Sequence, residues 1–287
     1  MARAVVNGIE VNYATEGSGP PLLLCAPGGF DASIEKWSTN PVWQRVRPIE
    51  TFAARFTCVA YDRRESGHSG GRVEPLLWRV YAAEAKGLLD HLRIDRAFVL
   101  GACMGCSVAL ALAVAYPQAV RGLVLHWPTG GREWRRITHE RWLGVHAAYV
   151  REQGLGAAVA RAREAGSFMK EFRAGPWASV IARDPDFARE FAAMDADRYL
   201  ALLEASAARL YDRDTAPGAE PAELKALRAP TFIVPGDDQY HATSAALYLR
   251  DLIADAEYWD CPAAQQRPED LRERILSFLS RHSRDDA

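Results

Sequence analysis

Ala97-Phe98-Val99-Leu100-Gly101-Ala102-Cys103-Met104-Gly105-Cys106 is an apolar run that ends in a turn with glycines on both sides of a cysteine. A helix-like stretch, residues 107–116, follows directly. This layout matches the G-x-S-x-G turn that lifts a nucleophilic side chain above a sheet, with cysteine in the place of serine. The glycines permit the sharp turn, and the start of a helix behind the sulfur favours thiolate over thiol. The pattern predicts a nucleophilic Cys103.

Two other interpretations of the same turn remain open at this point. A free cysteine in a tight turn is often a small buried core residue. Cys103 and Cys106 also form a C-x-x-C pair, which is typical of redox sites at a strand-to-helix turn. The rest of the chain has to decide among the three.

Composition narrows the class of protein. The chain has 287 residues, 49% of them hydrophobic and 25% charged, with a formal net charge of −2. This balance is typical of a globular protein and offers no basic surface for nucleic acid or an anionic membrane. No run approaches the roughly 18 apolar residues of a membrane-spanning helix. We therefore expect a small-molecule substrate and neither a nucleic-acid nor a membrane partner; the oligomeric state is left open.

The cysteines point to a reducing compartment. There are five of them, an odd number, and the N-terminal residues show no apolar core of a signal peptide. We therefore expect a cytoplasmic protein with reduced thiols. No His/Cys spacing resembles a zinc site, so neither a metal nor a cofactor is expected.

The chain alternates between strand-like and helix-like segments. Residues 11–14 and the apolar runs at residues 22–26, 56–61, 97–100, 120–126, 231–235 and 256–260 predict strands, and residues 37–55, 77–92, 107–116, 242–253 and 267–282 have helical spacing. Such alternation predicts an α/β fold with a doubly wound, mostly parallel sheet. Residues 131–225 contain no strand-like run and have helical periodicity. We therefore assign 1–130 and 226–287 to an α/β core and 131–225 to a helical lid over the carboxyl edge of its sheet.

Five stretches in this order resemble the α/β-hydrolase family over essentially the whole chain. They are Leu23-Leu-Cys-Ala-Pro27-Gly28-Gly29, Asp62-Arg63-Arg64-Glu-Ser-Gly67-His-Ser69, Gly101–Cys106, Tyr116-Pro117-Gln-Ala-Val120, and Gly236-Asp237-Asp238. They resemble the family's oxyanion loop (with Pro for His), its D-x-R-G-x-G-x-S loop, its nucleophile turn, its Y-P-e-x-V segment and its acid-bearing loop. The resemblance implies a catalytic Cys103, and it disfavours the redox interpretation because thioredoxin-like folds are much smaller.

One departure from the family concerns the base. The family's catalytic histidine follows the last strand, but residues 260–269 contain none, and the expected position falls on or near Cys261. His241 and His126 both lie at strand ends where they could replace it. We predict His241 as the base and Asp238 as the acid that orients its ring, with Asp237 as the rival acid.

The oxyanion site follows from the resemblance. Family geometry uses the backbone N–H after the nucleophile, here Met104, and one from the oxyanion loop, here Gly29 or Phe30. Asp31, Arg63 and Arg64 are expected to be solvated loop charges. The aromatic residues of the lid are expected to serve mainly as core packing.

These assignments predict an enzyme that cleaves an ester, thioester or lactone through an acyl-thioester on Cys103. Dienelactone hydrolases have the same fold and a cysteine nucleophile, but they keep the usual histidine. The alternatives are an acyltransferase or condensing enzyme, a cofactor-free lyase, and a non-catalytic ligand-binding protein. Neither the substrate nor the pathway follows from the sequence.

Overall fold

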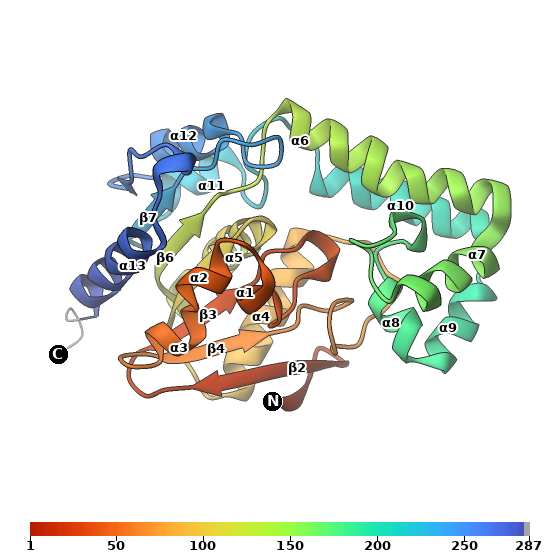
Figure 1. Ribbon diagram of the computed structural model, residues 1–287, viewed down its shortest axis with the longest axis horizontal. Coiled ribbons are helices and arrows are strands. Elements are labelled where there is room, and N and C mark those ends of the chain that lie inside the picture. The colour runs from red at the N-terminus through yellow and green to blue at the C-terminus, as the bar shows by residue number, and fades with distance from the viewer. Residues whose placement is uncertain (284–287) are drawn as a thin grey trace.

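A computed structural model describes residues 1–283 and contains one eight-stranded sheet (Figure 1). Its strands are β1 (Ala2–Val6), β2 (Ile9–Glu16), β3 (Pro21–Cys25), β4 (Thr57–Tyr61), β5 (Ala97–Ala102), β6 (Val120–His126), β7 (Thr231–Val234) and β8 (Glu257–Tyr258). Their order is β1-β2-β4-β3-β5-β6-β7-β8. The β1–β2 and β2–β4 pairs are antiparallel, and every later pair is parallel. The predicted α/β fold class is confirmed.

The central strands are apolar on both faces because helices cover both sides of the sheet. The helices of the core are α1 (Lys36–Thr39), α2 (Trp43–Val46), α3 (Pro48–Phe52), α4 (Trp78–His91), α5 (Met104–Ala115), α12 (Thr243–Leu252) and α13 (Pro268–His282). Helices α4, α5 and α12 share one hydrophobic core with Leu23 and Val99. Helices α2, α3 and α13 form the opposite core with Leu22, Leu24 and Leu100. Neighbouring residues of a strand thus enter different cores, as the two-residue repeat requires.

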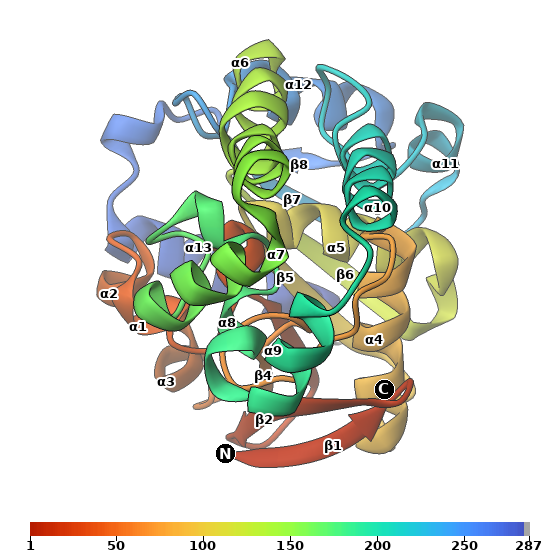
Figure 2. The same ribbon diagram turned by 90° about the vertical axis from the view of Figure 1, so that its right-hand side faces the viewer.

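The segment between β6 and β7 is helical. It contains α6 (Arg132–Arg136), a π-helical stretch (Ile137–Gly144), α7 (Val145–Ala165), α8 (Ala178–Arg183), α9 (Pro185–Ala192), α10 (Ala196–Leu210) and α11 (Pro221–Ala226). In Figure 2, α7 and α10 run side by side across the edge of the sheet near α5. No described helix is long and apolar enough to cross a membrane.

Two local predictions differ from the structure. Residues 37–55 form three short helices rather than one, because Arg47 has a left-handed backbone (φ 50°) and Pro48 starts a new helix. Strand β1 was not predicted; it pairs with β2 through the turn at Asn7-Gly8, both of which have positive φ. Asn-Gly is a strong hairpin signal, so the sequence did carry this information.

Candidate active site

Cys103 lies at the junction of β5 and α5 in a strained backbone conformation. Its φ and ψ are 56° and −126°, a region that residues with a side chain rarely adopt. The amide of Cys103 donates to the carbonyl oxygen of His126 at 3.1 Å, which fixes the turn to the next strand. The junction therefore holds the Cys103 side chain at the carboxyl edge of the sheet, directly before the first turn of α5.

The two glycines of this turn are required by close backbone contacts. A Cβ on Gly105 would lie 2.1 Å from the carbonyl oxygen of Cys25 in β3. A Cβ on Gly101 would lie 2.5 Å from the carbonyl oxygen of Gly105. Helix α5 can therefore approach the sheet closely only because both positions lack a side chain.

Cys106, the other cysteine of the turn, is a core residue. Its sulfur is fully buried and lies 3.1 Å and 3.3 Å from the carbonyl oxygens of Gly101 and His126. Burial raises the pKa of its thiol well above the ordinary value. All five cysteines are free thiols, so the structure contains no Cys103–Cys106 disulfide.

Asp238 and His241 form a compact unit in the loop after β7. Asp238 Oδ1 accepts hydrogen bonds from the backbone N–H groups of Tyr240 (2.7 Å) and His241 (2.9 Å). Both carboxylate oxygens lie 2.9 Å from Nδ1 of His241. The Asp238 carboxylate thus fixes the backbone of the loop through the two N–H groups, and it favours the His241 tautomer that carries its proton on Nδ1. Asp237, the rival acid, is exposed and makes none of these bonds.

The other side of the His241 ring faces the Cys103 thiol. The Nε2 atom is buried and has no hydrogen-bond partner of normal geometry, but Cys103 and His241 lie close enough for each to shift the pKa of the other. The structure therefore brings three of the predicted residues together in the order Cys103, His241, Asp238.

Electrostatics favour a thiolate and an imidazolium in this unit. Burial alone would raise the pKa of Cys103, but the His241 charge and hydrogen bond and the N–H groups of Met104 and Gly28 outweigh it and lower that pKa. Burial alone would lower the pKa of His241, but Cys103 and Asp238 raise it to about 10. The carboxyl of Asp238 is also partly buried, yet His241 holds its pKa below the ordinary value. Each charge in the unit stabilises its neighbour.

His126, the alternative base, is placed differently. Its ring stacks on Trp127 with centroids 5.2 Å apart and packs edge-on against Trp43 at 4.7 Å. Burial, aided by the His241 charge, lowers the pKa of His126 to about 3. Its Nε2 has no partner. The ring is thus a neutral core group on the α2 side of the sheet.

The loop after β8, which contains no histidine, supports His241 indirectly. Gln266 accepts a hydrogen bond from the Trp127 indole (2.8 Å) and donates to the carbonyl oxygens of Pro235 (2.7 Å) and Cys261 (2.9 Å). The Trp127 ring in turn packs on His241, with centroids 5.7 Å apart. Neither Gln266 nor Trp127 was predicted to be part of the site, since their spacing along the chain carries no signal.

Gln266→Leu is expected to lower the rate of Cys103 alkylation at pH 7 by about 10-fold, because one lost hydrogen bond frees the Trp127 ring that holds His241 in place. The pH profile of alkylation by iodoacetamide, followed by peptide mass spectrometry, measures the effect. Gln265→Leu, a change at the exposed neighbouring residue, should leave the profile unchanged. Equal profiles for both variants would remove this supporting role from Gln266.

The predicted oxyanion loop runs beside the Cys103 sulfur. The N–H groups of Met104 and Gly28 lie close enough to the sulfur to help lower the pKa of Cys103, and Gly28 was not among the predicted residues. Gly29 has φ 61°, and a Cβ there would lie 2.8 Å from the Trp142 ring of the lid. The Gly29 carbonyl accepts a hydrogen bond from Arg63 Nη2 at 2.6 Å. Small residues therefore let this loop lie between the sulfur, the lid and Arg63.

Three expectations about loop charges are wrong. Asp31 is buried, and its carboxylate accepts hydrogen bonds from the N–H groups of Phe168 (3.2 Å) and Met169 (3.0 Å). Arg63 and Arg64 are only 3% and 4% exposed. Asp31 thus joins the loop after β3 to the segment between β6 and β7 instead of facing solvent.

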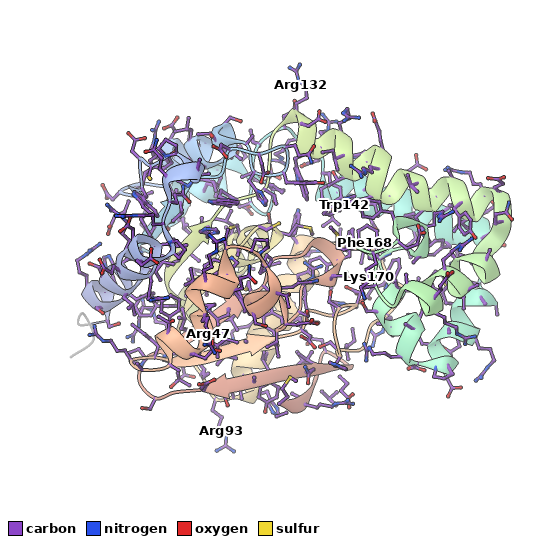
Figure 3. The ribbon with its side chains drawn as sticks, viewed as in Figure 1. Arg47, Arg93, Arg132, Trp142, Phe168 and Lys170 are labelled. Carbon is purple, nitrogen blue, oxygen red and sulfur yellow. The ribbon has the colours of Figure 1, made fainter. Side chains whose placement is uncertain are left out.

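Aromatic side chains of the lid cover the site. Trp142 packs against Phe30 (6.1 Å), Phe168 (5.6 Å) and Tyr240 (6.4 Å), measured between ring centroids. Figure 3 shows Trp142 and Phe168 between the lid and the core, whereas Arg132 points away from the molecule. These aromatic rings cover the loop that contains Gly28 and Gly29.

Within residues 1–283, no group of three or more His, Cys, Asp and Glu side chains could hold a metal ion.

The site combines a cysteine on the turn between β5 and α5 with a His–Asp pair after β7, two strands away, beneath the helical segment between β6 and β7. The fold is the α/β-hydrolase fold, and residues 21–153 match the model of the family described as alpha/beta hydrolase fold. The enol-lactonase from Burkholderia xenovorans LB400 superimposes with a TM-score of 0.62 at 19% identity, covering 97% of this chain and 100% of that one.

Curated relatives match part of the chain. A putative carbamate hydrolase from Azorhizobium caulinodans is 32% identical over 51% of this chain and 54% of its own length. A 2-hydroxymuconate semialdehyde hydrolase from a Pseudomonas species is 32% identical over 44% of this chain and 42% of its own. The chain thus spans about half, or less, of the length of these relatives.

Proposed function

We propose that the protein is a hydrolase that cleaves small-molecule esters, thioesters or lactones without a cofactor, through an acyl-thioester on Cys103. The observation that carries the proposal is the pairing of the Cys103 thiol with His241, each of which shifts the pKa of the other, together with the orientation of the His241 ring by Asp238 at 2.9 Å. The names of the relatives, several of them hydrolases, agree with this reaction class.

The resting state supports direct attack by a thiolate. The Cys103 thiolate adds to the substrate carbonyl carbon, and the N–H groups of Met104 and of the Gly28–Gly29 segment bind the resulting oxyanion. When the bond to the leaving group breaks, His241 donates its Nε2 proton to that group. The product of this half-reaction is an acyl-thioester beside a neutral imidazole.

The second half-reaction uses the change in charge at Cys103. Of the groups that raise the pKa of His241, the Cys103 thiolate contributes most. Acylation removes that negative charge, so the imidazole becomes a base near neutral pH. His241 then takes a proton from water, the hydroxide adds to the thioester carbonyl, and the C–S bond breaks. The imidazolium–thiolate pair is restored.

Intact-mass spectrometry after rapid acid quench tests the proposal directly. The wild-type protein, mixed with a p-nitrophenyl ester or an N-acetylcysteamine thioester, is expected to gain the mass of one acyl group. Cys103→Ala should gain none, and Cys261→Ala, which removes another partly exposed thiol, should keep the adduct. Turnover without any adduct would support the lyase alternative. An adduct that partitions to added alcohols or amines faster than to water would support an acyltransferase.

A further inference from the structure

Arg63 is a buried cation without a counter-ion in contact. Its guanidinium lies over the Tyr81 ring at 4.3 Å, and Nη2 donates to the Gly29 carbonyl. The Nε and Nη1 atoms are buried and have no hydrogen-bond partner. Among residues 1–283, no carboxylate lies within ion-pair distance of this side chain. Buried donors without a partner destabilise the fold. The Nε and Nη1 groups of Arg63 are therefore available to bind a ligand.

Three carboxylates close to Arg63 bond to Arg64 instead. Arg64 donates to Glu65 at 2.9 Å and also bonds Glu74. The Glu84 carboxyl accepts the backbone N–H of Arg64 at 2.9 Å. Burial raises the pKa of Glu84 to about 8, so at neutral pH this group is mostly uncharged. Arg64 is thus neutralised by direct contacts, and Arg63 is not.

Two tyrosines extend the polar region from Arg63 to the reacting sulfur. The Tyr81 hydroxyl, on α4, is buried and has no partner. Tyr211, directly after α10, is also buried, and its hydroxyl lies 4.0 Å from the sulfur of Met104, the residue after Cys103. Arg63 and Cys103 both lie close enough to act on the charge of the Tyr211 hydroxyl. The free donors of Arg63 and Tyr81 therefore belong to the same covered region as the Cys103 thiol.

We propose that Arg63 and Tyr81 bind a free carboxylate on the substrate, so that the preferred substrates are esters, thioesters or lactones of a second, ionised carboxylic acid. Nε and Nη1 of Arg63 present two adjacent N–H donors, which match the two oxygens of a carboxylate, and the Tyr81 hydroxyl supplies a third donor. The inference rests on the proposed function, because it assigns this carboxylate to the substrate of the Cys103 reaction.

Paired thioesters that differ only in charge test the subsite. We would compare the N-acetylcysteamine thioesters of glutaric and adipic acid with the same compounds carrying a primary amide in place of the free carboxylate. For the wild-type protein, kcat/KM should favour the carboxylate by about 10- to 100-fold, the value of hydrogen bonds to a charged group. The ratio should fall to about 1 in Arg63→Gln and decrease by a few-fold in Tyr81→Phe.

The ratio separates binding of the carboxylate from support of the loop. Arg63→Gln also loses the bond to the Gly29 carbonyl, so the rates for both substrates should fall, but only a carboxylate subsite makes their ratio change. Arg135→Gln, a matched loss of a half-exposed arginine on α6, should leave the ratio at its wild-type value. Binding of glutarate to the Cys103→Ala protein, followed by calorimetry, provides a readout without catalysis and should weaken by a few-fold in the Cys103→Ala/Tyr81→Phe double variant.

Opposite results distinguish the two proposals. A wild-type ratio near 1, with Cys103 acylated by both substrates, would overturn the carboxylate subsite and leave the proposed function standing; ordered water would then satisfy Arg63. Failure of every thioester to acylate Cys103, together with glutarate binding that depends on Tyr81, would overturn the proposed function and leave an anion site.

Discussion

His241→Gln should slow acylation of Cys103 at pH 7 by about 10²- to 10⁴-fold, the usual contribution of a positioned acid–base group. Without His241 the buried thiol loses the charge and the hydrogen bond that oppose its desolvation. The pKa of Cys103 should therefore rise above the ordinary thiol value of about 8.5. Asp238→Asn should produce a smaller change in the same direction, because the ring keeps a hydrogen-bonding neighbour but loses the charged one.

The pH profile of Cys103 alkylation by iodoacetamide gives the sign of the effect. A lowered pKa means that the wild-type thiol ionises at a lower pH than an ordinary thiol, so its alkylation rate should rise and level off at a lower pH than that of a free cysteine. In His241→Gln the rate should instead rise through the alkaline range. His68→Gln, a change at an exposed histidine, is the matched control. A wild-type profile in His241→Gln would remove His241 from the site and direct attention to His126.

Gly105→Ala should destabilise the protein by about 3 kcal/mol, at the upper end of the cost of overpacking. The new Cβ would lie 2.1 Å from the Cys25 carbonyl oxygen and 2.8 Å from its carbon. Both atoms belong to the backbone of β3, which is held by β4 and β5 on its two sides. Relief is therefore possible only if α5 moves away from the sheet, which also displaces the Met104 N–H from the Cys103 sulfur.

Urea unfolding measures this loss, and Gly156→Ala in α7 is the control. A Cβ on Gly156 meets no atom within 4 Å, so alanine should stabilise the helix by about 0.5–1 kcal/mol. Unfolding midpoints that coincide for Gly105→Ala and the wild type would show that the elbow tolerates a side chain and that the close contact of α5 with β3 is not required.

Local sequence patterns predicted most of the fold. Apolar runs bounded by glycine, proline and aspartate predicted the central strands, because strands covered on both faces must be apolar throughout. The Asp238–His241 contact was also accessible from the sequence, since residues three apart in a tight loop can meet through an Asx turn. The roles assigned to Cys103, His241, Asp238, Met104 and Gly29 stay predictions that the experiments above address.

The contacts that the sequence did not predict join residues far apart in the chain. Gln266 and Trp127 are joined by a hydrogen bond across 139 positions, and Asp31 and Met169 across 138. Such contacts depend on how β6, β8 and the helical segment between β6 and β7 are placed, and the periodicity of the sequence does not predict them. Arginine is usually solvated, so the burial of Arg63 and Arg64 could not be inferred before the lid was in place.

The sequence by itself determined the α/β-hydrolase fold, the glycine-flanked turn around Cys103 and the helical character of the lid, because backbone sterics and apolar periodicity act over a few neighbouring residues. Only the tertiary structure shows that the His126 ring is enclosed in the core while His241 lies near Cys103, and that Arg63 is enclosed without a counter-ion in contact. Those outcomes depend on burial and electrostatic contact between separate elements, which arise only when the sheet, its loops and the lid pack together.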